Sequence, residues 1–215
     1  MLPGVPFPRD DLVAFLVAIS FAAGLNVYAT VATLGLLART GVLVLPAGLD
    51  SIASEWVIGV SALLFFVEFI ADKIPLFDLI WNALHTFVRV PVGALLAYGA
   101  TSQLGPGWQA VAAAVGGTIA LAAHGAKTAA RAAVTPSPEP FSNFALSVAE
   151  DAFTIFITWF ATEHPIQAAA IVAVLLVAIV VLLRWIVRAL RSLFNVAASS
   201  TIRPRAVGAR DRPFH

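Results

Sequence analysis

Long apolar segments, each interrupted by only a few polar residues, follow one another along the whole chain. About 20 apolar residues are enough for one helix to cross the hydrocarbon core of a bilayer. The pattern therefore predicts an all-α membrane protein with about six transmembrane helices in a single domain over residues 1–194. The predicted spans cover approximately residues 12–37, 55–74, 76–98, 108–134, 144–162 and 166–187. The remaining residues, 195–215, are predicted to form a basic, disordered tail.

The composition supports a membrane protein and excludes several other classes. Of the 215 residues, 60% are hydrophobic and 12% are charged, and the mean hydropathy is +0.92. Soluble domains have roughly 45–50% apolar and about 25% charged residues, so this chain has too little polar surface to be one. The absence of cysteine excludes a disulfide scaffold, thiolate catalysis and iron–sulfur clusters. The net charge of +1 gives no indication of a nucleic-acid partner.

The basic residues are distributed unevenly, and their distribution predicts an orientation. Seven of the 13 Lys and Arg residues follow residue 183. With six spans, both termini would lie on the same side, together with 11 of the basic residues, while Arg39 alone would lie on the other side. Because basic residues gather on the cytoplasmic side, both termini are predicted to be cytoplasmic. Binding of lipid headgroups by the tail is a secondary expectation.

Two halves of the sequence, residues 11–100 and 108–194, share some features. Residues 22–29 and 122–129 are both small-residue runs with a polar centre in the middle of a predicted span. If the halves are repeats of three spans each, they must have opposite orientations in the membrane, as in many transporters. The alternative is a chance likeness between alanine-rich helices, since the third and sixth spans do not match.

Carboxylates inside the predicted spans are candidates for ion or proton binding. Each charge at the centre of a bilayer costs at least about 2.5–3.5 kcal/mol. Glu68 and Asp72 are four residues apart and share one helix face, which suits the binding of cations or protons. Alternatively, Asp72 lies at the headgroups. Glu150 and Asp151 point about 100° apart, so one would face the interior, unless their helix begins late and both lie near the surface.

Basic side chains form stripes on two other predicted helices. His124, Lys127 and Arg131 are spaced i, i+3, i+7, and His85 and Arg89 are spaced i, i+4. In one interpretation, His85, Arg89 and Arg131 are charge partners that neutralise the acids. In the other, acids and bases line opposite walls of a polar cavity, where His124 and Lys127 contact an anionic part of a substrate. The two interpretations are compatible.

A polar residue beside small residues interrupts the first predicted span. Asn26 follows Gly24, and Tyr28 comes shortly afterwards. An unwound stretch here would expose backbone carbonyl groups that could bind a cation. The alternative is close helix packing, which glycine and alanine permit.

The polar runs also carry a resemblance. Residues 24–30 (GLNVYAT), 67–75 (VEFIADKIP), 124–131 (HGAKTAAR) and the pair Glu150–Asp151 resemble a family of bacterial integral membrane proteins classed as domain-of-unknown-function family 4126. The resemblance implies a bacterial cytoplasmic (inner) membrane location and no particular activity. The run 68–73 is also similar to the acidic motif of a family of cation/proton exchangers, although its acids are one residue further apart.

These observations predict a transporter of a small solute or ion, coupled to protons or cations through buried carboxylates. The predicted binding residues are Asn26, Tyr28, Glu68, Asp72, His124, Lys127, Glu150 and Asp151. The alternative function is a non-transporting scaffold or lipid-interacting protein. An enzyme is not expected, because the chain has neither a His-Glu-x-x-His motif nor a nucleophile elbow. No cofactor is expected, metal binding is left open, and exposed small-residue faces would allow a homodimer.

Overall fold

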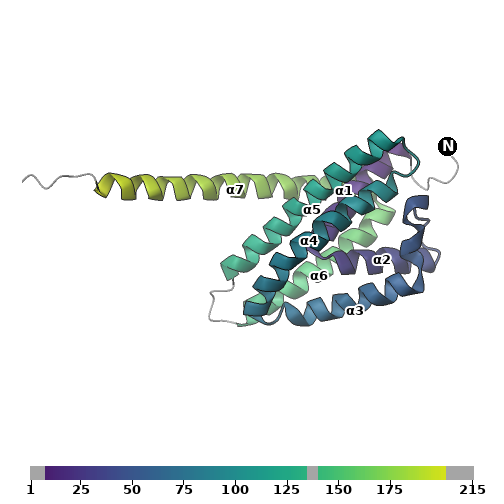
Figure 1. Cartoon of the computed structure of the whole chain (residues 1–215), viewed down its shortest axis with the longest axis horizontal. Coiled ribbons are helices and arrows are strands. Elements are labelled where there is room, and N and C mark those ends of the chain that lie inside the picture. The colour runs from purple at the N-terminus through teal and green to yellow at the C-terminus, as the bar shows by residue number, and fades with distance from the viewer. Residues whose placement is uncertain (1–7, 135–139, 202–215) are drawn as a thin grey trace, which may run out of the picture. The chain divides into compact units, whose positions relative to one another are not determined.

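The computed structural model describes residues 8–134 and 140–201, which form an all-helical protein (Figure 1). No strand occurs within these two ranges, so the predicted all-α fold class is confirmed. In chain order the elements are α1 (Arg9–Leu25), α2 (Val27–Arg39), the 3-10 helix η1 (Ala47–Ala53), α3 (Glu55–Ala71), α4 (Pro75–Ala100), α5 (Pro106–Val134), α6 (Pro140–Glu163) and α7 (Pro165–Thr201).

Four helices, α4 to α7, are long and apolar enough to cross a membrane. A fifth candidate is the pair of η1 and α3, which is bent by 66°. The prediction of six spans is therefore wrong: the described residues provide four candidate spans, or five if the bent pair is one span. Because an odd number would place the termini on opposite sides, the cytoplasmic position of both termini stays a prediction.

The number of spans is lower because the first two predicted spans are built from shorter pieces. The first consists of α1 and α2, which meet at Asn26, where the backbone is extended (φ −151°, ψ 102°). The second corresponds to α3, which has 17 residues. At a rise of 1.5 Å per residue, α3 is about 25 Å long, shorter than the roughly 30 Å hydrocarbon core.

Proline begins four of the helices, at Pro75, Pro106, Pro140 and Pro165. The first N–H groups of a helix have no partner within it, and the fixed φ of proline suits the first turn. Proline therefore costs nothing at these positions and prevents the preceding helix from continuing. Pro91, in contrast, lies inside α4.

Helix α1 lies against α4, α5 and α6 (Figure 1). Small residues make its approach to α5 possible: a Cβ atom on Gly24 would lie 2.7 Å from the Cβ of Ala123 and would collide with the carbonyl oxygen of Ala120. Helices α4 and α5 approach each other in the same way, since a Cβ on Gly116 would lie 2.5 Å from the Cβ of Ala97. The close packing brings polar side chains on these helices within reach of one another.

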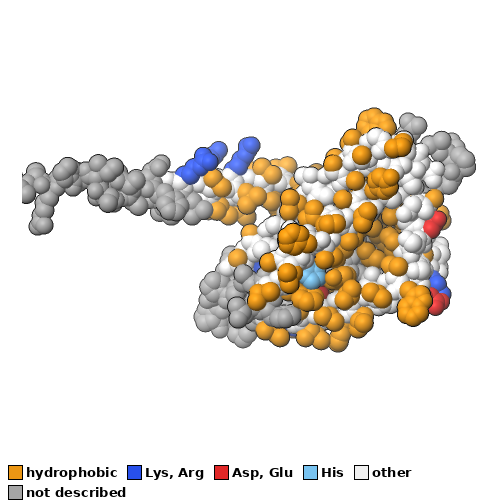
Figure 2. Space-filling model, viewed as in Figure 1, with side chains coloured by type: hydrophobic (Ala, Val, Ile, Leu, Met, Phe, Trp, Pro, Cys, Tyr) orange, Lys and Arg blue, Asp and Glu red, His pale blue; other side chains and the backbone are white. Residues whose placement is uncertain are grey.

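Large apolar side chains cover much of the outer surface (Figure 2). Trp56, Phe87 and Trp108 are 85%, 81% and 68% exposed, respectively. An apolar surface of this extent is unfavourable in water and marks a contact with lipid or another protein. Together with the apolar helices, it indicates a multi-pass membrane protein.

The chain divides into two compact units, residues 1–176 and 177–215, with the boundary inside α7. In the second unit, α7 continues to Thr201, past residue 195, where the tail was predicted to begin. Arg184, Arg188 and Arg191 are exposed on this part of α7. The rest of the predicted tail, residues 202–215, lies outside the described residues.

The two predicted repeat halves contain different sets of elements. Residues 11–100 hold α1, α2, η1, α3 and α4, whereas residues 108–194 hold α5, α6 and most of α7. The inverted 3+3 repeat therefore stays a prediction.

Candidate functional site

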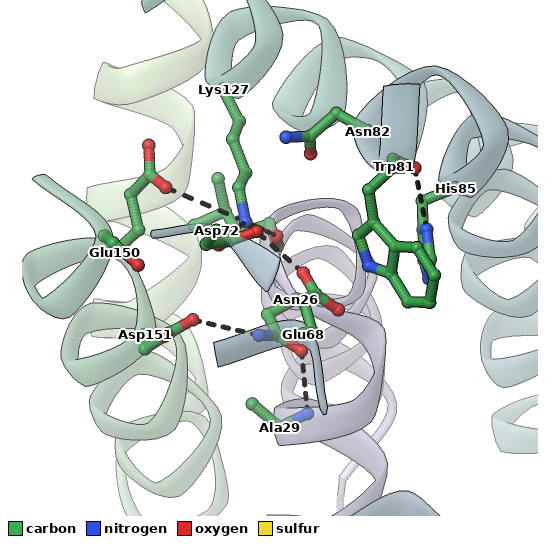
Figure 3. A network of polar contacts seen from close by, with 12 residues as sticks. Asn26, Ala29, Glu68, Asp72, Trp81, Asn82, His85, Lys127, Glu150 and Asp151 are labelled. Atoms are coloured by element: carbon green, nitrogen blue, oxygen red, sulfur yellow. Dashed lines mark hydrogen bonds and ion pairs between the residues drawn. The ribbon is translucent and has the colours of Figure 1, made fainter. Parts of the chain in front are cut away.

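The charged residues predicted inside the spans meet in one buried network (Figure 3). Its members come from the end of α3, from α4, from the C-terminal third of α5, from the middle of α6 and from the junction of α1 with α2. Their helical spacing turns each set towards the same interior region. The residues are Asn26 at the junction, Glu68 and Asp72 on or next to α3, Asn82 and Arg89 on α4, His124, Lys127 and Arg131 on α5, and Glu150 and Asp151 on α6.

Side chains form hydrogen bonds with the groups at the break between α1 and α2. The Asn26 side-chain oxygen accepts a hydrogen bond from the backbone N–H of Ala29 (3.0 Å), which caps the start of α2. The Asn26 side-chain amide donates to Asp151 Oδ1 (2.9 Å). The Leu25 carbonyl accepts a hydrogen bond from Lys127 Nζ (3.1 Å). The break predicted at Asn26 and the close packing at Gly24 are therefore both present.

Lys127 lies at the centre of the network. Its ammonium nitrogen is 3.4 Å from Glu68 Oε1, 3.5 Å from Asp72 Oδ2 and 3.7 Å from Glu150 Oε2. The side chains of Lys127, Glu68 and Asp72 are completely buried, and that of Glu150 is 12% exposed. One ammonium group thus shares its charge among three carboxylates from two helices and the residue after α3.

Arg131 joins two of the same carboxylates. Its Nη2 donates to Asp72 Oδ2 (2.9 Å) and to Glu150 Oε2 (2.7 Å), and its Nε also donates to Glu150 Oε2 (3.0 Å). A third donor, Nη1, reaches the backbone carbonyl of Asp72 (3.2 Å). These short charge-assisted contacts hold the end of α3 to α5 and α6.

Arg89 binds the remaining carboxylate, Glu68, with its Nη2. Its Nη1 donates to Asn82 Oδ1 (3.2 Å) and to His124 Nδ1 (2.9 Å). Because a guanidinium group can only donate, Nδ1 of His124 accepts, and Nε2 carries the proton that it donates to Thr86 Oγ1 (2.8 Å). In this arrangement His124 is therefore neutral and accepts a hydrogen bond from Arg89.

His85 and Tyr28 form a separate contact beside the network. Nδ1 of His85 donates to the Trp81 carbonyl (2.8 Å), so Nε2 accepts from the Tyr28 hydroxyl (3.1 Å). His85 was predicted to be a charge partner of the acids. It hydrogen-bonds a phenol and a carbonyl instead, because its place on α4 turns it towards α2.

Several buried atoms of the network have no hydrogen-bond partner among the described residues: Glu68 Oε2, Arg89 Nε and Asp151 Oδ2. Asp151 is 4% exposed, and its hydrogen bond within the described part of the chain comes from the neutral Asn26. The network thus contains four carboxylates and three cationic side chains, those of Arg89, Lys127 and Arg131. Of the four carboxylates, Asp151 is the one whose described hydrogen bond comes from a neutral side chain.

Lys73 lies at the edge of the network, between α3 and α4. Its ammonium group donates to the Phe69 carbonyl (2.9 Å) and to Ser147 Oγ (3.4 Å), and lies 3.4 Å from the centre of the Phe69 ring. Partial burial lowers the pKa of Lys73, while Asp151 and Asp72 oppose that change. Asp72 is buried within the protein, while its depth relative to the lipid headgroups stays a prediction.

The network is closed in this conformation. We predicted either charge neutralisation or a polar, water-accessible cavity. The structure shows acids and bases in direct contact, with Glu68, Arg89 and Lys127 wholly inaccessible to solvent. Within residues 8–134 and 140–201, no group of three or more His, Asp or Glu side chains is arranged to hold a metal ion.

Two partners in the network were not predicted. Asn82 and Thr86 lie seven and three residues before Arg89, on the same side of α4. Asn82 precedes the predicted His85–Arg89 stripe by helical spacing and Thr86 lies within it, so a fuller account of the polar positions on this side of α4 would have found both. The sequence could not predict the contact of Lys127 with the Leu25 carbonyl, because every residue type has a backbone carbonyl group.

A family model described as "Domain of unknown function (DUF4126)" matches residues 13–185 of the chain. The match covers the helical region that holds the whole network. No curated protein and no solved structure gives a significant match.

Proposed function

The chain belongs to this family of unknown function, and from that premise we propose that it is an integral membrane transporter of a small solute or ion. Transport would be coupled to protons or cations bound by the carboxylates of the network. The observation that carries the proposal is the buried network itself, in which three cationic side chains share carboxylates from α3 and α6.

The energetics of buried charge support a working role. Each charge costs at least about 2.5–3.5 kcal/mol to place in a membrane. Replacing a buried ion pair by apolar side chains of similar volume is often neutral or stabilising. Glu68, Asp72 and Lys127 would therefore add little to the stability of the helical bundle, so their presence in its centre points to a role in function. Charged groups at this depth commonly mark a path for ions, protons or substrate.

The sharing of partners supports a network that can rearrange. Lys127 contacts three carboxylates, and Arg131 contacts two. If one carboxylate binds a proton or cation, the cationic side chain it releases still has another partner. In this proposal, the closed arrangement would be the occluded state of an alternating-access carrier, with Glu150, whose side chain is 12% exposed, at its edge.

The interrupted helix adds independent support. Transporters commonly place substrate and ion sites where a helix is broken, because the ends of the two pieces present unpaired backbone groups. Here the break at Asn26 directs the Leu25 carbonyl to Lys127 and the Asn26 amide to Asp151. In the proposed mechanism, Glu68 and Asp72 bind the coupling ion, with Glu150 or Asp151 as the counterpart.

Reconstituted flux tests the proposal. The full-length protein is placed in proteoliposomes, and pH-gradient dissipation and ion uptake are measured under imposed pH, Na⁺ and K⁺ gradients. Glu68→Gln is expected to abolish coupled flux, whereas Glu55→Gln, which changes the exposed partner of Arg39, leaves it intact. Unchanged flux in Glu68→Gln would refute the proposed role of Glu68. The absence of flux through the wild-type protein under every gradient would refute the proposed function of the protein.

A scaffold or lipid-interacting role is the second candidate. Three exposed arginines, Arg184, Arg188 and Arg191, follow the most apolar stretch of α7 at helical spacing. Such a basic segment next to a span attracts anionic lipid headgroups. Replacing Arg184, Arg188 and Arg191 with glutamine, together with removal of the residues after 195, is expected to weaken a lipid or scaffold role and to leave transport intact.

The location and assembly form part of the same proposal. We place the protein in a bacterial cytoplasmic membrane with both termini in the cytoplasm, and we propose a homodimer through exposed small-residue faces. The proposal includes no catalytic activity and no cofactor. Labelling of single introduced cysteines from either side of the membrane tests the orientation.

A further inference from the structure

The ammonium group of Lys127 occupies a cradle of four oxygen atoms from separate parts of the fold. They are the Leu25 carbonyl at the helix break (3.1 Å), Glu68 Oε1 (3.4 Å), Asp72 Oδ2 (3.5 Å) and Glu150 Oε2 (3.7 Å). Carboxylate and carbonyl oxygens are also the ligands that hard metal cations prefer. With Lys127 in place, these side chains are not arranged to hold a metal ion. The same oxygen atoms would become available to a free cation only when the ammonium group leaves them.

We propose that this cradle is a binding site for a monovalent cation and that the Lys127 ammonium is its tethered occupant. The ammonium group leaves the cradle when a free cation enters. This inference rests on the proposed transport function and names the class of ion that the network would handle.

The contact distances favour exchange at Lys127. Among its four contacts, only that with the Leu25 carbonyl is in the usual range of a strong hydrogen bond, 2.7–3.2 Å. Arg131, in contrast, is held by contacts of 2.7 and 2.9 Å to Glu150 and Asp72. Lysine carries a compact charge on a flexible stem, so its ammonium group can move while Arg131 keeps the carboxylates in place.

The charge of the cradle selects a monovalent ion. The three carboxylates of the cradle, on Glu68, Asp72 and Glu150, are balanced by Lys127, Arg131 and Arg89. Withdrawing the ammonium leaves these groups of the cradle with an excess of one negative charge, which one monovalent cation would balance; Asp151, which accepts a hydrogen bond from the neutral Asn26, contributes no oxygen to the cradle. Glu68 Oε2, which is buried without a hydrogen-bond partner among the described residues, offers an additional ligand atom.

The direct test removes the tethered occupant. Lys127→Ala is purified as the full chain in mild detergent, and its thermal unfolding is followed while Na⁺, K⁺ or methylammonium chloride replaces N-methylglucamine chloride at constant ionic strength. A ligand that binds only the folded state stabilises it as its concentration rises. We expect Tm to rise by about 3–5 °C for each tenfold increase in cation above its Kd.

Three matched proteins separate a site from a general salt effect. In the wild-type protein and in Lys73→Ala, which removes a neighbouring lysine outside the cradle, the tethered ammonium competes with the free cation, so any rise should need a much higher cation concentration. Lys127→Ala/Glu150→Gln removes one positive and one negative charge, so the cradle no longer lacks a cation and the rise should disappear. If Lys127→Ala does not fold, Lys127→Gln, which keeps a polar group and loses the charge, is measured in its place.

The outcomes are distinct. A saturable rise in the single Lys127 variant, at cation concentrations that leave the wild-type protein unchanged, supports the proposal. No rise with any of the three cations, an equal rise in the wild-type protein or in the double variant, or a response to pH alone overturns it. Failure of the transport function would appear differently, as cation binding by the Lys127 variant together with no flux through wild-type proteoliposomes.

Discussion

Replacing Glu68 with glutamine removes the carboxylate that Arg89 and Lys127 share. Lys127 keeps Asp72 and Glu150 as partners, but the other described hydrogen bonds of Arg89 go to the neutral side chains of Asn82 and His124. The guanidinium group would then be a buried charge without a carboxylate partner.

The size of the effect follows from that geometry. Breaking a buried pair by removing one partner costs about 3–5 kcal/mol. Glu68→Gln should therefore lower Tm by roughly 6–20 °C, at 2–4 °C per kcal/mol for a chain of this size. The double variant Glu68→Gln/Arg89→Met removes both charges, so it should cost less than the sum of the single variants, with a coupling of about 1–3 kcal/mol.

Unfolding in mild detergent, followed by tryptophan fluorescence and circular dichroism, measures these differences. Glu55→Gln is the control, because its partner Arg39 and Glu55 itself are 49% and 74% exposed in their side chains. An exposed pair contributes about 0–1 kcal/mol. Two results would refute the reasoning: a cost for Glu68→Gln no greater than that for Glu55→Gln, or additive effects in the double variant.

Two further substitutions test the packing and the helix break. Gly24→Ala should destabilise the fold by about 1–3 kcal/mol, because the added methyl group collides with Ala120. The control is Gly125→Ala on α5, where an added Cβ meets nothing within 4 Å. It should be neutral or slightly stabilising in the same melting assay. Asp151→Asn keeps the oxygen that accepts from Asn26 and removes a buried negative charge whose described hydrogen bond comes from a neutral group, so the Tm of this variant should be at least that of the wild-type protein. A decrease in Tm as large as that of Glu68→Gln would contradict this description of Asp151.

The sequence predicted the helical class and much of the network's membership, for physical reasons that can be named. Charged residues in apolar segments stand out, and the spacings of Glu68 with Asp72 and of Lys127 with Arg131 place each pair on one helix face. Proline marked helix starts, because it has no N–H to donate and disfavours helix in the preceding residue. These signals are local in the chain.

The number of spans and the choice of partners are not local. Hydropathy cannot distinguish one span over residues 12–37 from two helices joined at Asn26, since the break depends on Lys127 and Asp151 meeting the freed backbone and side-chain groups. The same limitation applies to His85, whose contact with Tyr28 depends on where α2 turns after the break. Which acid meets which base is decided by three-dimensional packing.

The short connection between α3 and α4 has a consequence for how the chain enters the bilayer. Glu68 and Arg89 are only 21 positions apart, on helices separated by residues 72–74. The two helices can therefore enter the lipid as a hairpin whose opposite charges already neutralise each other, before the later helices are synthesised. Asp72 meets its ion-pair partners Lys127 and Arg131 only when α5 is present, and Glu150 on α6 joins them last.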